Sequence, residues 1–262
     1  MSMLSTPRLP DGGSDPQFMQ SLARGLAVLE AFSDHGSDQT ISRLTEHTQL
    51  PRSVVVRCLH TLVQLGYLEQ QEKSYRPRPR VLRLADAFLS DRSLPAIAQP
   101  ILEELRDELS ESCSLGVLEG DEIIYAARAS QSRIMAVSLH VGSRLPAWCT
   151  SMGRVLLASL PVEQREALVP SCLAALTPNT QTDRGELLKE ITAVARQGYA
   201  VVDQELELGL RSIAVPVVDK SGVTVAALNA GTNAFDRSAD ELLDTFLPVL
   251  RAGAVKLSRL AP

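Results

Sequence analysis

Apolar residues recur at helical spacing in the first quarter of the chain. Four apolar residues of "SLARGLAVLEAF" share one face of a predicted helix: Leu22, Leu26, Leu29 and Phe32. A second, shorter helix is predicted in "DQTISRLTEHT", where Thr40 is the candidate N-cap. The pattern therefore predicts two consecutive helices that can pack against each other.

The next stretch, "QLPRSVVVRCL", is compatible with either a strand or a helix. Three consecutive valines favour a buried strand, but a buried strand would not carry the two arginines that flank them. Apolar residues continue at helical steps, at Val55, Leu59, Leu62 and Leu65. Pro51 suits the first turn of a helix, where its missing N–H removes no hydrogen bond. The pattern predicts a third helix, which ends at Gly66.

The other face of this third helix is polar and basic. The segment after it, "YLEQQEKSYRPRPR", predicts a strand, a polar turn and a second, basic strand. Arginines on a helix face alone indicate only a solvated surface. Three short helices followed by a basic hairpin, however, predict a winged helix-turn-helix, whose third helix enters the major groove while the hairpin contacts phosphates. The predicted DNA-contacting residues are Arg24, Arg52, Ser53, Val56, Arg57, His60, Thr61, Lys73, Arg76 and Arg78.

The remaining chain predicts a linker helix and an α+β domain. The linker helix is expected over Val81 to Ser90, and a further helix from about Pro95 to Ser110. Strand-like segments are "CSLGVLEG", "DEIIYAARA", "MAVSLHV", "YAVVDQE", "RSIAVPVVD" and "VTVAALNAG", and helix-like segments are "SMGRVLLASL", "RGELLKEITAVARQG" and "SADELLDTFLPVLRAGAVKLSRL". An antiparallel sheet with helices beside it is typical of α+β sensor domains.

Composition favours two globular domains of ordinary size. The chain has 262 residues, of which 45% are hydrophobic. No apolar run reaches the roughly 18 residues of a membrane span, so we expect no membrane partner. Residues 1–16, rich in Ser, Pro, Gly and Asp, predict a disordered tail. The four cysteines form no CxxC pair, so we expect reduced thiols, a cytoplasmic protein, no metal site and no cofactor.

The charge is distributed unevenly along the chain. The net charge is −5, yet residues 17–80 carry eight Lys or Arg against six Asp or Glu. Residues 81–262 carry 17 against 23. A locally basic N-terminal unit joined to an acidic body is typical of a DNA-binding domain fused to a second domain.

Three stretches resemble the IclR-type bacterial transcription regulators: "QSLARGLAVLEAF", "TISRLTEHTQLPRSVVVRCLHTLVQLGYL" and "GYAVVDQELELGLRSIAVPVVD". In the third stretch, six positions match the family pattern: Gly198, Glu205, Ser212, Ile213, Ala214 and Asp219. Val202 and Val218 depart from it. The segments "DQELELGLRSIAVPV" and "VGSRLPAWCTSMGRVLLA" are similar to the branch that regulates catabolism of protocatechuate, 4-hydroxybenzoate and β-ketoadipate.

This resemblance implies a ligand-responsive regulator of catabolic genes. It places a winged helix-turn-helix domain at residues 17–80, a linker helix at 81–91 and a GAF/profilin-like α+β effector-binding domain at 92–262. The implied partners are double-stranded operator DNA, a small aromatic or dicarboxylic acid, and a second copy of the chain in a homodimer that can assemble into a tetramer. We expect the linker helix to couple effector binding to DNA binding.

The resemblance also implies where the effector binds. Ser151 and Met152 start a predicted helix, whose free N–H groups suit a carboxylate. Ser212, Asn229 and Gly231 are expected on two strands, where Gly231 leaves room for a bulky ligand. Apolar walls are expected from Ile134, Val137, Leu145 and Leu210, with Trp148 as a ring platform. Such apolar residues are equally typical of a core. Arg133 and Arg144 are candidate partners for the carboxylate, or exposed surface charges.

Two other classes of function were weighed. An enzyme would need a catalytic motif, but the chain has no G-x-S-x-G, Walker loop, G-x-G-x-x-G or H-E-x-x-H. The alternating Asp203, Glu205 and Glu207 predict a solvated or interface patch on one strand face rather than an acid pair or a metal site. A thiol-based redox regulator would use Cys58 or Cys149. Cys58, however, is expected to face the helical core, and Cys149 has no resolving partner in the sequence.

Overall fold

The computed structural model describes residues 15–89, 93–131 and 139–260. The chain divides into two compact units, Met1–Ala87 and Phe88–Pro262. This division falls inside the linker helix that the sequence predicts at 81–91. No helix in the described ranges combines the length and the apolar character that a membrane crossing requires.

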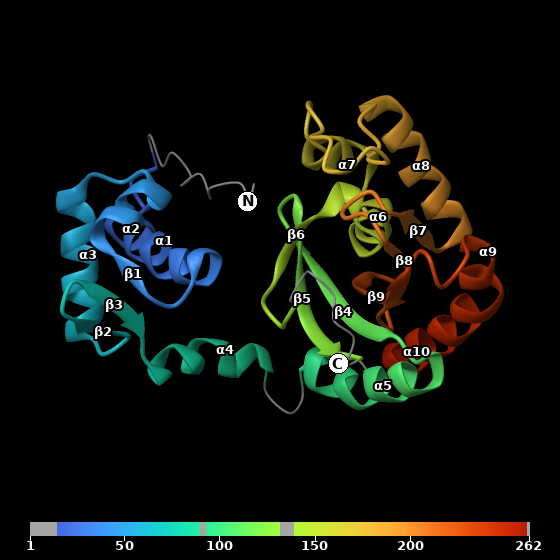
Figure 1. The fold of residues 1–262 in the computed structure, drawn as a ribbon, viewed down its shortest axis with the longest axis horizontal. Coiled ribbons are helices and arrows are strands. Elements are labelled where there is room, and N and C mark those ends of the chain that lie inside the picture. The colour runs from blue at the N-terminus through green and yellow to red at the C-terminus, as the bar shows by residue number, and fades with distance from the viewer. Residues whose placement is uncertain (1–14, 90–92, 132–138, 261–262) are drawn as a thin grey trace. The chain divides into compact units, whose positions relative to one another are not determined.

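The N-terminal unit is a winged helix-turn-helix, as predicted (Figure 1). Its elements are α1 (Gln20–His35), β1 (Gln39–Thr40), α2 (Ile41–Thr48), α3 (Arg52–Gln64), β2 (Leu68–Gln71) and β3 (Ser74–Pro77). The wing strands β2 and β3 are antiparallel, and β1, which the sequence did not predict, adds to β3. The three helices enclose a core that includes Phe32, Leu44, Val55 and Leu59.

Local sequence signals set the ends of these helices. The hydroxyl of Thr40 accepts a hydrogen bond from the Arg43 N–H at 3.4 Å, which confirms the predicted N-cap of α2. Gly66 follows α3 with a φ of 76°, a conformation that favours glycine. One expectation differs: Leu22 and Leu26 are 57% and 47% exposed, because the buried stripe of α1 runs through Val28 and Phe32. The protein thus exposes an apolar stripe on α1.

A short helical segment follows the wing. The turn η1 (Pro79–Val81) leads into α4 (Leu82–Leu89), which matches the predicted linker helix closely. Leu82 and Leu84 are 72% and 56% exposed. The segment therefore presents apolar side chains outward within its own unit.

The C-terminal unit is built on a six-stranded antiparallel sheet with the order β6-β5-β4-β9-β8-β7. The strands are β4 (Ser112–Glu119), β5 (Glu122–Ala129), β6 (Arg144–Pro146), β7 (Ala200–Asp203), β8 (Leu210–Val218) and β9 (Thr224–Asn233). The helices are α5 (Leu94–Leu109), α6 (Ser151–Ala158), α7 (Val162–Leu168), α8 (Arg184–Gln197), α9 (Ala239–Glu241) and α10 (Leu247–Leu260), with the 3-10 turn η2 (Ala147–Cys149) and the π-helical segment η3 (Leu242–Phe246). The predicted α+β fold is confirmed.

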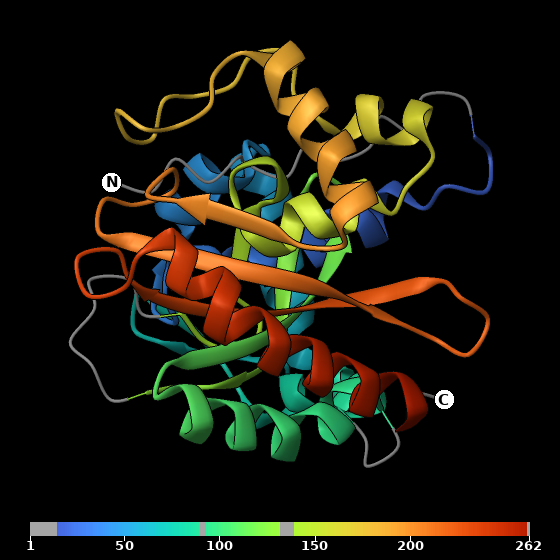
Figure 2. The same cartoon turned by 90° about the vertical axis from the view of Figure 1, so that its right-hand side faces the viewer.

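Helices cover both faces of this sheet (Figure 2). One core lies between the sheet and α5 with α10, and includes Leu102, Ile213 and Leu250. The other lies on the opposite face, beneath α6 and α8. Gly153 lets α6 approach closely, because an added Cβ would lie 2.0 Å from the Ala147 carbonyl oxygen. This second face carries the candidate site.

Candidate functional site

A cavity of about 270 Å³ lies between the sheet and the start of α6. A cavity of about 150 Å³ already accommodates a benzene ring, so this one has room for a substituted ring. Its lining combines apolar, hydroxyl and charged side chains: Glu111, Ser112, Tyr125, Arg128, Ser130, Gln131, Leu139, Leu145, Cys149, Thr150, Ser151, Met152, Val202, Leu206, Glu207, Leu210, Ser212, Asn229 and Gly231. A few polar groups among apolar ones are typical of a ligand pocket.

The floor of the cavity is a row of paired residues across four strands. Ser112 on β4 pairs with Gly231 on β9, Gly231 with Ser212 on β8, and Ser212 with Val202 on β7. Side chains of directly paired residues share a face of the sheet. All four residues line the cavity. At the centre, Gly231 leaves space, since an added Cβ would approach only Leu210 Cδ1, at 3.8 Å.

The next row of the sheet contributes Arg128 and Asn229, which both pair with Ser114 on β4. Arg128 Nη1 donates to Ser114 Oγ at 2.8 Å, and its Nε donates to Ser130 Oγ at 3.1 Å. Its guanidinium also lies over the Tyr125 ring, 5.8 Å from the centroid. Burial lowers the pKa of the Arg128 guanidinium below its ordinary value. No ion pair joins Arg128 to a carboxylate in the described part of the chain.

Among the residues that the structure describes, three buried polar atoms of the lining have no hydrogen-bond partner: Ser151 Oγ, Glu207 Oε2 and Asn229 Oδ1. Buried polar atoms are normally hydrogen-bonded, because leaving one unpaired costs about 1–3 kcal/mol. Ser151 and Asn229 are only 1% and 8% exposed. These unpaired atoms in the cavity lining can form hydrogen bonds with a polar ligand.

The start of α6 adds backbone donors to this capacity. Thr150 caps the helix by accepting a hydrogen bond from the Gly153 N–H at 3.2 Å. The N–H groups of Ser151 and Met152, at the first two helical positions, have no partner within the helix. The helix dipole makes this end favourable for an anion.

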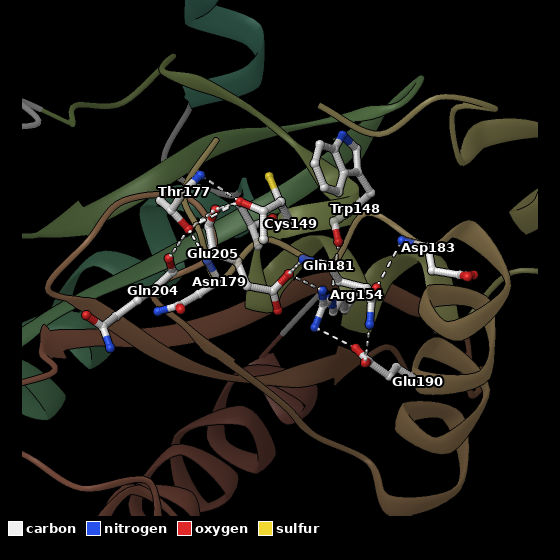
Figure 3. A network of polar contacts seen from close by, with 12 residues as sticks. Trp148, Cys149, Arg154, Thr177, Asn179, Gln181, Asp183, Glu190, Gln204 and Glu205 are labelled. Carbon is white, nitrogen blue, oxygen red and sulfur yellow. Dashed lines mark hydrogen bonds and ion pairs between the residues drawn. The ribbon is translucent and has the colours of Figure 1, made fainter. Parts of the chain in front are cut away.

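The buried Arg154 fixes the connection between β7 and β8, which contributes to the cavity lining (Figure 3). Arg154 on α6 donates from Nη2 to Glu205 Oε2 at 2.7 Å and from Nη1 to Glu190 Oε2 at 3.0 Å. Its Nε donates to the Trp148 carbonyl at 3.1 Å. Glu205 lies between β7 and β8, and Glu190 lies on α8. One guanidinium thus ties together α6, α8 and the β7–β8 connection.

The β7–β8 connection has further fixed points. Glu205 Oε2 also accepts a hydrogen bond from the Gln181 N–H at 3.0 Å. The hydroxyl of Thr180 donates to the Glu205 carbonyl at 2.7 Å, and that of Thr177 donates to the Gln204 carbonyl at 2.6 Å. Because Glu205 is held from several sides, the residues after it, Leu206 and Glu207, are placed firmly in the cavity lining.

The predicted solvated patch of Asp203, Glu205 and Glu207 is wrong. Strand β7 ends at Asp203, and Gln204 turns the chain with a φ of 59°, so the expected alternation stops there. Asp203 pairs with Arg211 at 2.8 Å, an interaction that lowers the pKa of this carboxyl below its ordinary value. Glu205 pairs with Arg154, and Glu207 lines the cavity. Each carboxylate therefore has its own environment.

Seven of the residues predicted for the effector site line the cavity: Leu145, Ser151, Met152, Leu210, Ser212, Asn229 and Gly231. Trp148 does not line it; its side chain packs in the core under α6 and is 6% exposed. Ile134, Val137 and Arg133 lie outside the described residues. Arg144 is engaged by Glu119 and Glu122, both at 2.8 Å, so it does not serve the cavity. Whether the seven residues bind an effector stays a prediction.

Sequence reasoning missed Arg128, Tyr125 and Glu207. A signal for Arg128 was present, since it is the only cationic residue within the otherwise apolar strand core "IIYAARA". A charged residue in a buried strand needs a partner. No comparable signal identified Glu207, because its position depends on the turn at Gln204.

Three of the cysteines, Cys58, Cys113 and Cys149, do not have the properties of redox sensors. Burial raises the pKa of Cys149 to about 12, and that of Cys113 to about 12 as well. Burial also raises the pKa of Cys58. Since the thiolate is the reactive form, these thiols are poor nucleophiles at neutral pH. Within the described residues, no group of three or more His, Cys, Asp or Glu could hold a metal ion.

The predicted DNA-contacting face is exposed on α3. Arg52, Ser53, Arg57 and His60 are all exposed, and Val56 is 40% exposed. Thr61 is also exposed, although its hydroxyl donates to the Arg57 carbonyl at 2.9 Å. The opposite face, with Val55 and Leu59, is buried. The helix therefore presents polar and cationic groups to solvent while its apolar face holds it in the unit.

The predicted DNA-contacting residues of the wing differ in exposure and in ion pairing. Lys73 lies at the turn between β2 and β3, and Arg78 follows β3; both are exposed. Arg76 on β3 is paired with Asp38 at 2.6 Å, so its charge is partly compensated. Arg24 lies on α1 and is partly buried. Lys73 and Arg78 are thus the wing cations that are most available for phosphates.

Comparison with known proteins agrees with this architecture. The family described as "Bacterial transcriptional regulator IclR C-terminal" matches residues 86–259, and "IclR helix-turn-helix domain" matches residues 21–72. The chain is 48% identical to the Pca regulon regulatory protein of Pseudomonas putida, over 92% of this chain and 83% of that protein. It is 37% identical to the p-hydroxybenzoate hydroxylase transcriptional activator of Acinetobacter baylyi, over 93% and 92%.

A solved structure adds a ligand to the comparison. The IclR homologue of Microbacterium hydrocarbonoxydans, complexed with 4-hydroxybenzoate, superposes with a TM-score of 0.79 at 29% identity, over 92% of this chain and 98% of that one. The chain therefore belongs to the IclR family of ligand-responsive, DNA-binding transcriptional regulators, and it is not an enzyme.

Proposed function

We propose that this protein regulates genes for the catabolism of aromatic acids, in the pathway of protocatechuate, 4-hydroxybenzoate and β-ketoadipate, and that a small acid of this class binds in the cavity. The relatives named for the Pca regulon and for p-hydroxybenzoate hydroxylase support the pathway. The homologue complexed with 4-hydroxybenzoate supports the chemical class of the effector. The observation that carries the proposal is Arg128, a cation in the cavity wall that pairs with no carboxylate among the described residues.

The chemistry of the cavity fits an aromatic acid. Arg128 offers a guanidinium to the carboxylate, and a charged pair in a partly buried site is stronger than a neutral hydrogen bond. Leu145, Leu206 and Leu210 supply apolar surface for the ring. Ser151 and Asn229 supply unpaired polar atoms for further hydrogen bonds.

A thermal-shift screen tests the effector. At about 100 times its dissociation constant, a ligand adds roughly 2.7 kcal/mol to the stability of the folded protein. We expect 4-hydroxybenzoate or protocatechuate to raise the Tm of the wild type, and Arg128→Gln to abolish the shift. Arg144→Gln is the matched control, because Arg144 pairs with Glu119 and Glu122 outside the cavity, and it should retain the shift. A full shift with Arg128→Gln would refute the assignment of the carboxylate anchor.

The DNA-binding form is proposed to be a homodimer. Met19, Leu22 and Leu26 are spaced along one side of the α1 region and are 66%, 57% and 47% exposed. An apolar stripe of this kind is suited to a second copy of the chain. Two recognition helices would read two half-sites, which one helix cannot do. Leu22→Glu combined with Leu26→Glu should convert the protein to a monomer in analytical ultracentrifugation and weaken operator binding. A dimer that persists would contradict this interface.

Effector binding is proposed to change operator binding through α4. A ligand shifts an equilibrium only if it binds two arrangements with different affinity. Because α4 connects the two units and exposes Leu82 and Leu84, its packing can differ between such arrangements. Leu82→Ser should therefore change the effect of the acid on operator affinity while leaving the affinity for the acid itself within about twofold. Unchanged coupling would exclude α4 as the coupling element.

A further inference from the structure

We propose that Glu207 selects the effector: its carboxylate accepts a hydrogen bond from a ring hydroxyl of an aromatic monocarboxylate and repels dicarboxylates. This inference rests on the proposed function, since it assumes that the cavity holds the acid. It goes further, because the proposed function does not say which residue distinguishes a ring hydroxyl from a second carboxylate.

The first support is the state of the Glu207 side chain. Its Oε2 is buried in the cavity lining and has no hydrogen-bond partner. An ionised carboxylate oxygen only accepts hydrogen bonds, so the group that satisfies it must be a donor. A phenolic hydroxyl is such a donor, and a ligand carboxylate is not. Leaving the oxygen unpaired would carry a desolvation cost that the hydroxyl removes.

The second support is the distribution of charge in the cavity. Among the described lining residues, Arg128 is the one cation, whereas Glu111 and Glu207 are both acidic. A monocarboxylate can use Arg128. A second ligand carboxylate would find no second cation in these residues, and near Glu207 it would meet a like charge in a partly desolvated site. The charges therefore favour one acidic group and one hydroxyl in the ligand.

The third support is the separation of the two groups. Arg128 lies on β5, and Glu207 lies in the connection that leads into β8, three strands away in the order β5-β4-β9-β8. Neighbouring strands are about 4.8 Å apart, so the two attachment points are separated by roughly 14 Å across the strands. They are also offset along the strands, because Arg128 lies in the row of Ala214 whereas Glu207 precedes Leu210. Side chains reach inward from both ends. A rigid ring with an acid at one end and a hydroxyl at the other can span the remaining distance.

The fourth support is that Glu207 cannot easily move away. The connection that carries it is held by the pair of Glu205 with Arg154 at 2.7 Å and by the hydroxyls of Thr177 and Thr180. A carboxylate on a firmly placed segment can discriminate between ligands, because it cannot relax to avoid the wrong one.

The test compares three acids that differ only at the para position: benzoate, 4-hydroxybenzoate and terephthalate, which carries a second carboxylate. Dissociation constants are measured by titration calorimetry on the full-length protein. We expect the wild type to bind 4-hydroxybenzoate at least tenfold more tightly than benzoate, and terephthalate more weakly than benzoate. Glu207→Gln should reduce the preference for the hydroxyl to about threefold or less and strengthen terephthalate binding at least tenfold.

Controls separate this inference from the proposed function. Glu104→Gln, on α5 at the opposite face of the sheet, should keep the wild-type ranking. If Glu207→Gln does not fold, Glu207→Asp gives the same comparison, because its shorter carboxylate should lose the hydroxyl preference yet still repel terephthalate. If all three acids bind but terephthalate equals 4-hydroxybenzoate, the selection by Glu207 is overturned and the proposed function stands. If no acid binds, both are overturned.

Discussion

The pair of Arg154 with Glu205 makes a quantitative prediction about stability. The two side chains are 5% and 11% exposed, whereas Glu190, the other partner of Arg154, is 45% exposed. Glu205→Gln keeps the shape of the side chain and removes its charge, which leaves the buried guanidinium with one carboxylate partner, the exposed Glu190. Breaking a buried ion pair costs about 3–5 kcal/mol. Because Glu190 remains, we expect a loss at the lower end, about 3 kcal/mol.

The matched variant is Glu190→Gln, which makes the same chemical change on the same guanidinium at an exposed site. Exposed pairs contribute about 0–1 kcal/mol, so this variant should lose less than about 1 kcal/mol. Urea unfolding followed by tryptophan fluorescence is a suitable assay, because Trp148 is the single tryptophan of the sequence and lies in the C-terminal unit. In a domain of this size, 3 kcal/mol also corresponds to roughly 6–12 °C in Tm. Equal losses in the two variants would refute the argument from burial.

Three further predictions concern separate regions. Arg57→Ala should weaken operator binding by about 1–3 kcal/mol if Arg57 reads a base, and unchanged affinity in a DNA titration would exclude α3 as the recognition helix. Gly231→Ala should fold normally, since its Cβ approaches only one atom at 3.8 Å, yet weaken binding of bulky acids; a large drop in Tm would contradict the open space above it. Exposed Cys172 should react with a thiol reagent at pH 7 much faster than Cys149, whose pKa of about 12 keeps it protonated until strongly alkaline pH, and equal rates by mass spectrometry would contradict the burial of Cys149.

The architecture could be predicted from the sequence because its signals are local. Helical spacing after Pro51, a capping hydroxyl at Thr40 and a glycine at position 66 specify where α2 and α3 start and stop. The order of strand-like and helix-like segments specified an α+β domain. The strand β1 was missed because two residues, Gln39 and Thr40, carry no periodic signal.

The candidate site could be predicted only in part, for a physical reason. Ser212, Asn229 and Gly231 lie on regular strands, where alternation fixes the face of each side chain. Strand alternation alone does not distinguish Arg128 from Arg144 as a cavity cation. The difference lies in partners that are distant in the sequence, because Glu119 and Glu122 pair with Arg144. The position of Glu207 follows a turn and a buried ion pair, which no local pattern encodes.

The row of residues that forms the cavity floor has a consequence for how such a sensor can diversify. Ser212 faces the cavity, and its neighbour Ile213 is fully buried in the core against α5 and α10. Asn229 and Gly231 flank Ala230 in the same way. One step along the strand thus separates residues that line the cavity from residues that hold the domain together. Substitutions at alternate positions can change the shape and polarity of the cavity while the core on the other face stays intact. If the proposed effector site is correct, a small library at positions 112, 202, 212 and 231 is a rational starting point for biosensors of other acids.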